Sequence, residues 1–318
     1  MTAYLWCKSC CADKFKEDFS KWTSGDAALY EFIRTTQLTA TSNYGVMEWI
    51  PYDELRITGY LSRGGYGELQ AYYECASNAN QINHCFGITR APETDNIGLV
   101  LANERFGDLG NYVRTEHANL TWLDRVELLW NVADGLQAIH SNGLVHRDFH
   151  SGNILVRGRN TTTIADLGLC RQVDNFGIIM WQVASGKKPF RDVPYDTSLA
   201  IKLCRGTRPP IMKQMPDCLK ELMQQCWHDN PSMRPTSAEL KEKLWKWLYD
   251  YDCEEHKQIA LATRRQQKRQ NSGKNTDETQ TESSDSQSTH PQARYYSTLL
   301  PTQKLRELIY LILTCYIR

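Results

Sequence analysis

The order of apolar and polar positions along the chain predicts short strands first and helices afterwards. Leu55–Leu61 and Leu69–Tyr73 flank a glycine cluster, which predicts a β-hairpin. Phe86–Thr89 and Ile97–Leu101 are two further extended runs, and the polar turn Pro92–Asn96 separates them. This part of the chain is therefore predicted to form a small β-sheet.

A helical period replaces the strand pattern further along the chain. Residues on one face of a predicted helix recur at spacings of three and four, at Trp122, Val126, Leu129, Ala133, Leu136 and His140. Asn142-Gly143 is a typical helix end. Ile154–Val156 and Thr163–Ala165 predict a second hairpin, and Thr236–Glu239 is a capping box that opens the last helix of the domain. Strands followed by helices indicate an α+β fold.

Composition divides the 318 residues into four parts. Residues 1–51 are mixed and form an N-terminal extension. Residues 52–250 are dense in apolar runs and are predicted to be the folded domain. Residues 254–293 are polar and of low complexity, which predicts a disordered linker. Residues 294–318 form a small apolar tail.

The charge balance gives no reason to expect a nucleic acid or an anionic membrane as partner. Lys+Arg and Asp+Glu both number 37, so the formal net charge is zero. No run reaches the about 20 apolar residues that span a bilayer. The closest run, Leu308–Leu313, predicts a short amphipathic helix, with a membrane anchor as the alternative.

The 11 cysteines are irregularly spaced, and the first residues contain no apolar leader segment. This pattern predicts free thiols in a reducing compartment, and so a cytoplasmic protein. Cys7 and Cys10 have the spacing of half a four-ligand zinc site, which stays open as an alternative.

One constellation of residues carries chemistry. His146-Arg147-Asp148 is followed by Asn153, and Asp166-Leu167-Gly168 begins 18 residues after Asp148. This spacing matches the catalytic loop and metal motif of protein kinases. Phosphoryl transfer needs an acceptor hydroxyl in line and neutralised phosphate charge. Asp148 is the candidate base, and the oxygens of Asn153 and Asp166 are candidate ligands of Mg²⁺, a hard cation.

The sequence resembles the tyrosine-kinase-like group of eukaryotic protein kinases, and is most similar to the greatly expanded kinase family of mycorrhizal fungi. The resemblance spans roughly residues 6–250. Besides the catalytic loop, it is carried by Trp49–Tyr52, Phe86–Arg90, Asp166–Cys170, Phe176–Trp181, Ser185–Phe190 and the stretch from Cys226-Trp227 to Arg234-Pro235.

That resemblance implies a two-lobed protein kinase-like fold, with a reduced β-sheet in the N-lobe, about residues 52–102, and a mainly helical C-lobe, about residues 103–250. It also implies ATP and Mg²⁺ as cofactors. The expected partner is a protein substrate with Ser, Thr or Tyr hydroxyls, or a signalling partner.

The resemblance further implies a nucleotide site. Leu61, Leu69 and Leu155 would sandwich adenine, and Leu101–Glu104 would be a hinge that offers backbone hydrogen bonds. A glycine-rich loop would approach the phosphates; here it is Ser62–Gly67, with Gly64, Gly65 and Gly67, and a plain hairpin turn is the alternative. Arg147 would contact a phosphorylated activation loop; a structural, hydrogen-bonded arginine is the alternative.

Two parts of the family pattern are missing. No lysine lies between Lys21 and Lys187, and only 19 residues separate Gly67 from Gly87. The third strand with its ATP-anchoring lysine, and the regulatory helix with its glutamate, are therefore predicted to be deleted. Only nine residues separate Asp166 from Phe176, too few for an activation segment.

These gaps have consequences for activity. Arg234 would lack the glutamate with which the family pairs it. Phosphoryl transfer is expected to be impaired. Two alternatives stay open: a pseudokinase that acts as a binding or scaffold module in signalling, and a gene model that lacks exons.

Overall fold

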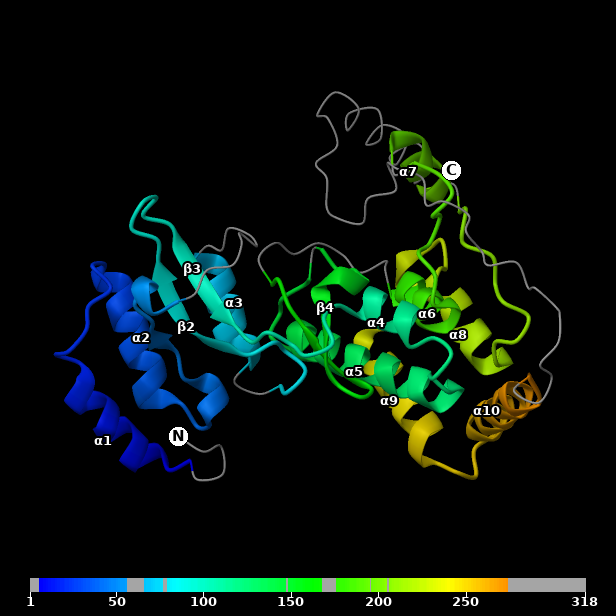
Figure 1. Ribbon diagram of the computed structural model, residues 1–318, viewed down its shortest axis with the longest axis horizontal. Coiled ribbons are helices and arrows are strands. Elements are labelled where there is room, and N and C mark those ends of the chain that lie inside the picture. The colour runs from blue at the N-terminus through cyan, green and yellow to red at the C-terminus, as the bar shows by residue number, and fades with distance from the viewer. Residues whose placement is uncertain are drawn as a thin grey trace. The chain divides into compact units, whose positions relative to one another are not determined.

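The computed structural model describes residues 6–55, 66–76, 79–146, 148–167, 176–194, 196–204 and 206–273 (Figure 1). The chain divides into two compact units. The first comprises Met1–Gly107, Asn131–Phe149 and Asn153–Val173, and the second Asp108–Trp130, His150–Gly152 and Asp174–Arg318. The sheets of the described part lie in the first unit, so the fold is α+β, as predicted.

A three-stranded sheet in the order β1-β2-β3 forms from Glu48–Trp49, Cys85–Arg90 and Ile97–Leu101 (Figure 1). The predicted hairpin of β2 and β3 is confirmed, and the two strands are antiparallel. β1 pairs with β2 in parallel, with Glu48 opposite Gly87. A Cβ atom on Gly87 would lie 2.1 Å from the Glu48 carbonyl oxygen, so only glycine permits this pairing.

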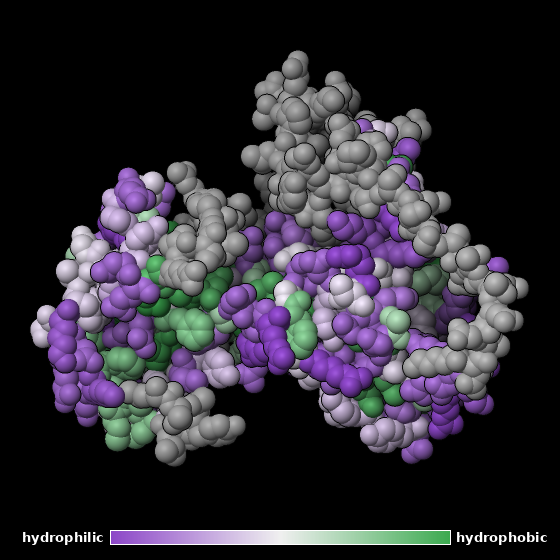
Figure 2. All heavy atoms as spheres, viewed as in Figure 1, coloured by the Kyte–Doolittle hydropathy of each residue, from purple (hydrophilic) through white to green (hydrophobic). Residues whose placement is uncertain are grey.

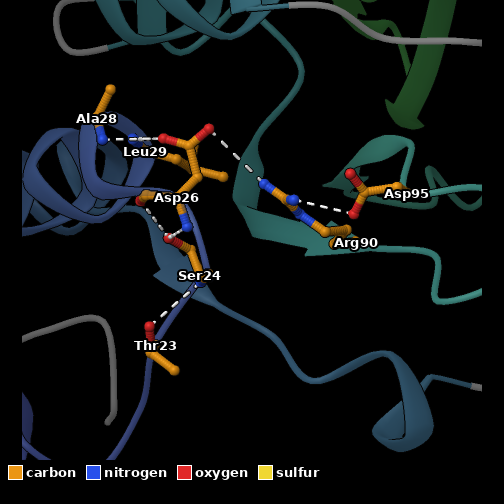
Figure 3. Close-up of polar contacts among 8 residues, drawn as sticks. Thr23, Ser24, Asp26, Ala28, Leu29, Arg90 and Asp95 are labelled. Atoms are coloured by element: carbon orange, nitrogen blue, oxygen red, sulfur yellow. Dashed lines mark hydrogen bonds and ion pairs between the residues drawn. The ribbon is translucent and has the colours of Figure 1, made fainter.

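In the N-terminal extension, α2, Ala27–Thr39, contacts β1, and α1, Lys8–Asp18, packs on α2. Figure 3 shows the polar link. Asp26 caps α2 and accepts from the Ala28 and Leu29 amides at 2.9 and 3.0 Å. These bonds, that of Leu29 first, lower the pKa of Asp26. Its second oxygen faces Arg90 at 3.8 Å, and Arg90 also donates to Asp95 at 2.9 Å.

The hairpin predicted around the glycine cluster is wrong in its second half, because Leu69–Tyr73 lies inside the helix α3, Tyr66–Ala76. Leu69, Tyr72 and Cys75 are all at most 1 % exposed. Their spacing of three places them on one face of a helix. The segment also lacks β-branched residues and contains good helix formers, which favours the helix further.

The helix α5, Trp122–Ser141, confirms the predicted periodic segment, and Gly143 follows it with a φ of +70°. The second predicted hairpin is also confirmed, as the antiparallel strands β4, Ile154–Gly158, and β5, Thr161–Ile164. Ile82 forms a bridge with Ile164, which joins the segment after α3 to β5. The described part also contains the short 3₁₀ turns η1 Asn43–Gly45, η2 Tyr52–Glu54 and η3 Ser151–Asn153.

Helices form the second unit, and α6 is buried along nearly its whole length and contacts α4 and α8. The predicted capping box is present, because Thr236 and Glu239 exchange their bonds at the start of α9. Besides the first part of α5 and the helix α10 described below, its elements include α4 Leu109–Thr115, α6 Phe176–Ser185, α7 Thr197–Cys204, α8 Asp217–Cys226, η4 Pro231–Met233 and α9 Ser237–Tyr249.

The polar segment after residue 253 was predicted to be disordered, and its first part is instead the helix α10, Glu254–Gly273. Ile259 is fully buried, and Thr263 is 7 % exposed. One turn later, the Gln266 amide donates to the Leu120 carbonyl at 2.9 Å. These residues form a narrow contact stripe on an otherwise polar helix. The rest of the predicted linker and the apolar tail lie outside the described residues.

Among the described helices, none is both long and apolar enough to cross a membrane.

Candidate active site

The catalytic-loop histidine organises the backbone around it. His146 is 1 % exposed, and its Nε2 lies 2.9 Å from the Ala165 carbonyl oxygen. Its Nδ1 accepts the Asp148 amide at 3.3 Å. Because Nδ1 accepts a hydrogen bond and Nε2 faces a carbonyl oxygen, these contacts favour the neutral tautomer protonated at Nε2. His146 therefore connects Asp148 to the segment that ends in Asp166.

Asn153 adds a second connection within this cluster. The side-chain amide of Asn153 donates to the backbone carbonyl of Asp148 at 2.9 Å. The backbone carbonyl of Asn153 accepts from the backbone amide of Ala165 at 2.8 Å. The hairpin of β4 and β5 sets this arrangement, because Ile154 pairs with Ile164. With its nitrogen used on the loop, the side-chain oxygen of Asn153 is the atom suited to a cation.

Asp166 follows β5 in an unusual backbone conformation, with a φ of +60°. Aspartate tolerates this left-handed region better than most residues, although it costs free energy. The Asp166 amide donates to the Tyr72 hydroxyl of α3 at 2.7 Å. Leu167, the next residue, is buried at 3 % exposure. Asp148 and Asn153 are thus bonded to Ala165, directly or through His146, and Asp166 is the next residue along the chain.

The predicted hinge Leu101–Glu104 is already bonded to the protein at several points. The Ala102 amide donates to the His84 carbonyl at 2.8 Å, and the Ala102 carbonyl accepts from the Asn83 side chain at 3.1 Å. The Glu104 carbonyl accepts from the Gly107 amide at 3.1 Å. Fewer backbone groups are therefore left for a ligand than the prediction assumed.

The Glu104 side chain points to a role that sequence reasoning missed. Its carboxylate accepts from Arg157 Nε at 3.0 Å and from the Thr163 hydroxyl at 3.4 Å, on β4 and β5. The nearby His84 is half-buried; burial lowers its pKa, and the Arg157 charge lowers it further. Glu104 therefore fixes the hinge to the hairpin that carries Asn153.

The family model of protein tyrosine and serine/threonine kinases matches residues 69–175 and 173–244, together more than half of the chain. The chain belongs to this kinase family. The two matches meet at residues 173–175, within the short interval between Asp166 and Phe176.

Relatives of this kinase domain carry kinase names for the most part. A serine/threonine-protein kinase/receptor of Acanthamoeba polyphaga mimivirus is 24 % identical over 268 residues, 65 % of this chain and 16 % of the relative. A serine/threonine-protein kinase of Dictyostelium discoideum is 27 % identical over 154 residues, 38 % of this chain and 9 % of the relative.

Cyclic GMP-binding protein C of Dictyostelium discoideum is 25 % identical over 275 residues, 71 % of this chain and 10 % of the relative. The chain therefore spans less than a fifth of the length of these three proteins.

The family match begins within α3, so this helix is part of the kinase domain. The prediction that no helix remained between Gly67 and Gly87 is wrong, since α3 fills the first half of that interval. Glu74 lies in this helix, and its carboxylate accepts from the Gln70 side-chain amide at 2.8 Å. The absence of a lysine between Lys21 and Lys187 follows from the sequence, and the presence of α3 does not change it.

The remaining nucleotide-site residues fall in different places. Leu155 is half-buried between the fully buried Ile154 and Val156, and Leu101 is half-buried at the end of β3. Leu69 is 1 % exposed on the packed face of α3, so the strand geometry behind its predicted adenine contact does not exist. Gly67 likewise lies in the first turn of α3. The predictions for Leu61, Gly64, Gly65 and Arg147 lie outside the described residues.

Arg234 has backbone partners where the family has a glutamate. Its Nε donates to the His228 carbonyl at 2.7 Å, and its guanidinium also reaches the Asp229 carbonyl at 3.5 Å. Backbone carbonyls five and six residues before Arg234 therefore accept hydrogen bonds from its guanidinium group.

Proposed function

We propose that this chain is a protein kinase domain for ATP-dependent phosphoryl transfer to protein hydroxyls, retaining the base and the metal ligands but turning over slowly. One observation carries the proposal. Asn153 is hydrogen-bonded to Asp148 and, through Ala165, to the segment that carries Asp166, while no lysine lies between Lys21 and Lys187.

Each of Asp148, Asn153 and Asp166 has a role that its chemistry supports. Asp148 accepts the proton of the acceptor hydroxyl. The Asn153 side-chain oxygen and the Asp166 carboxylate hold Mg²⁺, because both are hard oxygen donors. Leu101 and Leu155, each half-buried, contact the adenine. When bound, Mg·ATP supplies the phosphoryl group and neutralises its charge.

The fit is good for the metal and poor for the phosphates. α3 starts at Tyr66, directly after Gly64-Gly65, which leaves no room for a lysine-bearing strand between them. Loss of one preorganised charged group typically costs about 10²–10³ in rate, or roughly 3–4 kcal/mol. The hinge bonds of Ala102 and Glu104 add to the loss, since fewer of their backbone groups remain for adenine.

The hydroxyl preference follows the relatives. Two of those described above are named serine/threonine-protein kinases, so we propose serine or threonine before tyrosine. This chain spans only a small part of each relative, so the names of the relatives describe proteins much longer than this domain.

A pseudokinase that binds a protein partner is the second candidate. Two features favour this candidate: backbone groups of the predicted hinge are already hydrogen-bonded within the protein, and the lysine is missing. A binding module needs a folded surface but no anchor for phosphates. The two candidates differ in turnover.

Titration with Mg·ATP separates the two candidates. The full chain is followed by thermal shift, and transfer of radiolabelled phosphate is measured on mixed serine, threonine and tyrosine peptides. Asp166→Ala removes the proposed metal ligand and Asp148→Asn the base. Asp252→Ala, at an exposed acid of the second unit, is the matched control.

We expect a small thermal shift and slow transfer, both lost in Asp166→Ala and kept in Asp252→Ala. Asp148→Asn should lose transfer and keep the shift. A shift without transfer would support the binding module. Transfer that persists in Asp148→Asn would refute the assigned roles.

A further inference from the structure

Tyr72 is a fully buried side chain with a polar end, on the packed face of α3. A buried phenol normally has a hydrogen-bond partner. Here the Tyr72 hydroxyl accepts the backbone amide of Asp166 at 2.7 Å, across 94 positions of the sequence. A side chain of α3 therefore holds the backbone of the proposed metal ligand.

The hydrogen bond from Asp166 to Tyr72 lies at a residue with an unfavourable backbone conformation. Asp166 has a φ of +60°, a conformation that is unfavourable for a residue with a side chain. The preceding residue is fixed on the other side, because the Ala165 carbonyl faces His146 and its amide donates to Asn153. The catalytic loop thus holds Ala165, and α3 holds Asp166.

We propose that Tyr72 is a positioning residue that couples α3 to the metal site through the backbone of Asp166. The inference rests on the proposed function, in which the Asp166 carboxylate binds the metal. In the family, a lysine pairs with the glutamate of a helix and so links that helix to the nucleotide phosphates, and this chain has no lysine between Lys21 and Lys187. The Tyr72 hydroxyl supplies a shorter link, from helix to backbone, so a displacement of α3 changes the metal affinity.

Tyr73 offers a matched control on the same helix. Its hydroxyl lies 3.2 Å from the hydroxyl of Thr39, in the N-terminal extension, and its side chain is half-buried. Tyr72→Phe and Tyr73→Phe each remove one phenolic oxygen from α3. Only the first removes the bond to Asp166.

The experiment measures Mn²⁺ binding to the full chain by water-proton relaxation, in the unchanged protein, Tyr72→Phe, Tyr73→Phe and Asp166→Ala. Residues that orient a metal ligand typically contribute 10–100-fold to affinity. We expect binding that Asp166→Ala abolishes, that Tyr72→Phe weakens roughly tenfold and that Tyr73→Phe leaves unchanged. Amide hydrogen exchange at Asp166 should accelerate in Tyr72→Phe alone.

The outcomes separate the two proposals. Mn²⁺ binding that depends on Asp166, but is equal in Tyr72→Phe and Tyr73→Phe, overturns the coupling and leaves the proposed function intact. Absence of any Asp166-dependent binding in the unchanged protein overturns the metal site, and the coupling with it. Urea unfolding of both Phe variants checks that each is folded; a loss of affinity that tracks a loss of folded protein also overturns the coupling.

Discussion

The ion pair between Glu104 and Arg157 offers a quantitative test of how the hinge is held. The Glu104 side chain is 7 % exposed and that of Arg157 is 34 % exposed, with 3.0 Å between Oε1 and Nε. At an effective dielectric constant of about 20, two unit charges at this distance attract by about 5–6 kcal/mol. Desolvation of Glu104 and solvent around Arg157 offset most of this, and the net coupling should be about 1–2 kcal/mol.

The perturbation is Arg157→Ala, which leaves the buried carboxylate with the longer Thr163 contact. Loss of a partner costs about 3–5 kcal/mol in a fully buried pair and at most about 1 in an exposed one. Because Arg157 is one-third exposed, we expect a loss of about 2–3 kcal/mol of stability. Arg159→Ala, at an exposed arginine of the same hairpin, should change stability by less than about 0.5 kcal/mol.

Urea unfolding of the unchanged protein, Arg157→Ala, Glu104→Gln and the double variant gives the coupling by a double-mutant cycle. Glu104→Gln keeps the shape of the side chain and removes its charge. A coupling below about 0.3 kcal/mol, or equal effects of the two arginine variants, would refute the claim that this ion pair fixes the hinge to the hairpin.

Three further outcomes follow from contacts described above. Leu69→Ala should lose about 2–5 kcal/mol of stability in urea unfolding. Gln70→Ala, on the exposed side of α3, should lose less than about 0.5 kcal/mol. Equal losses in the two variants would contradict the packing of α3. Thr236→Ala should cost about 1 kcal/mol by removing the capping box, and an unchanged urea midpoint would contradict that role. Burial lowers the pKa of His84 and of His140, so the unfolded state binds protons first as pH falls. Stability should therefore be complete above about pH 6.5 and decline below it; urea midpoints that stay constant from pH 7.5 to 5.5 would contradict this sign.

Local patterns were sufficient for the elements whose residues repeat regularly. The spacing of three and four along α5 and the extended runs of β2 and β3 are visible in sequence, and the structure has all three. α3 was misread because the glycines before it suggested a hairpin. The spacing of three between Leu69, Tyr72 and Cys75 would have identified the helix.

The first half of the polar linker was misread for a different reason. The contact stripe of α10 is narrow, and composition averaged over 40 residues concealed Ile259 and Thr263. A polar composition predicts disorder only when no such stripe remains to be buried.

Sequence reasoning could assign site residues that belong to a motif, and no others. Asp148, Asn153 and Asp166 were predicted from a fixed spacing, and the structure bonds Asn153 to Asp148 and to Ala165, the residue before Asp166. Tyr72 and Arg157 act through partners 94 and 53 positions away. Contacts of that separation depend on how the elements pack, and no local pattern encodes them.

The short strand β1 lies before the predicted domain boundary at residue 52. A domain that began at this boundary would lack Glu48 and Trp49, which pair with β2. That pairing is possible because Gly87 has no side chain. Among the strands that the structure describes, β2 would then be an outer strand, and Gly87 and Ile88 would lose their partners in β1. Open strand edges pair with other chains. The shortened chain should therefore self-associate more readily than the full chain, which sedimentation at rising protein concentration would measure.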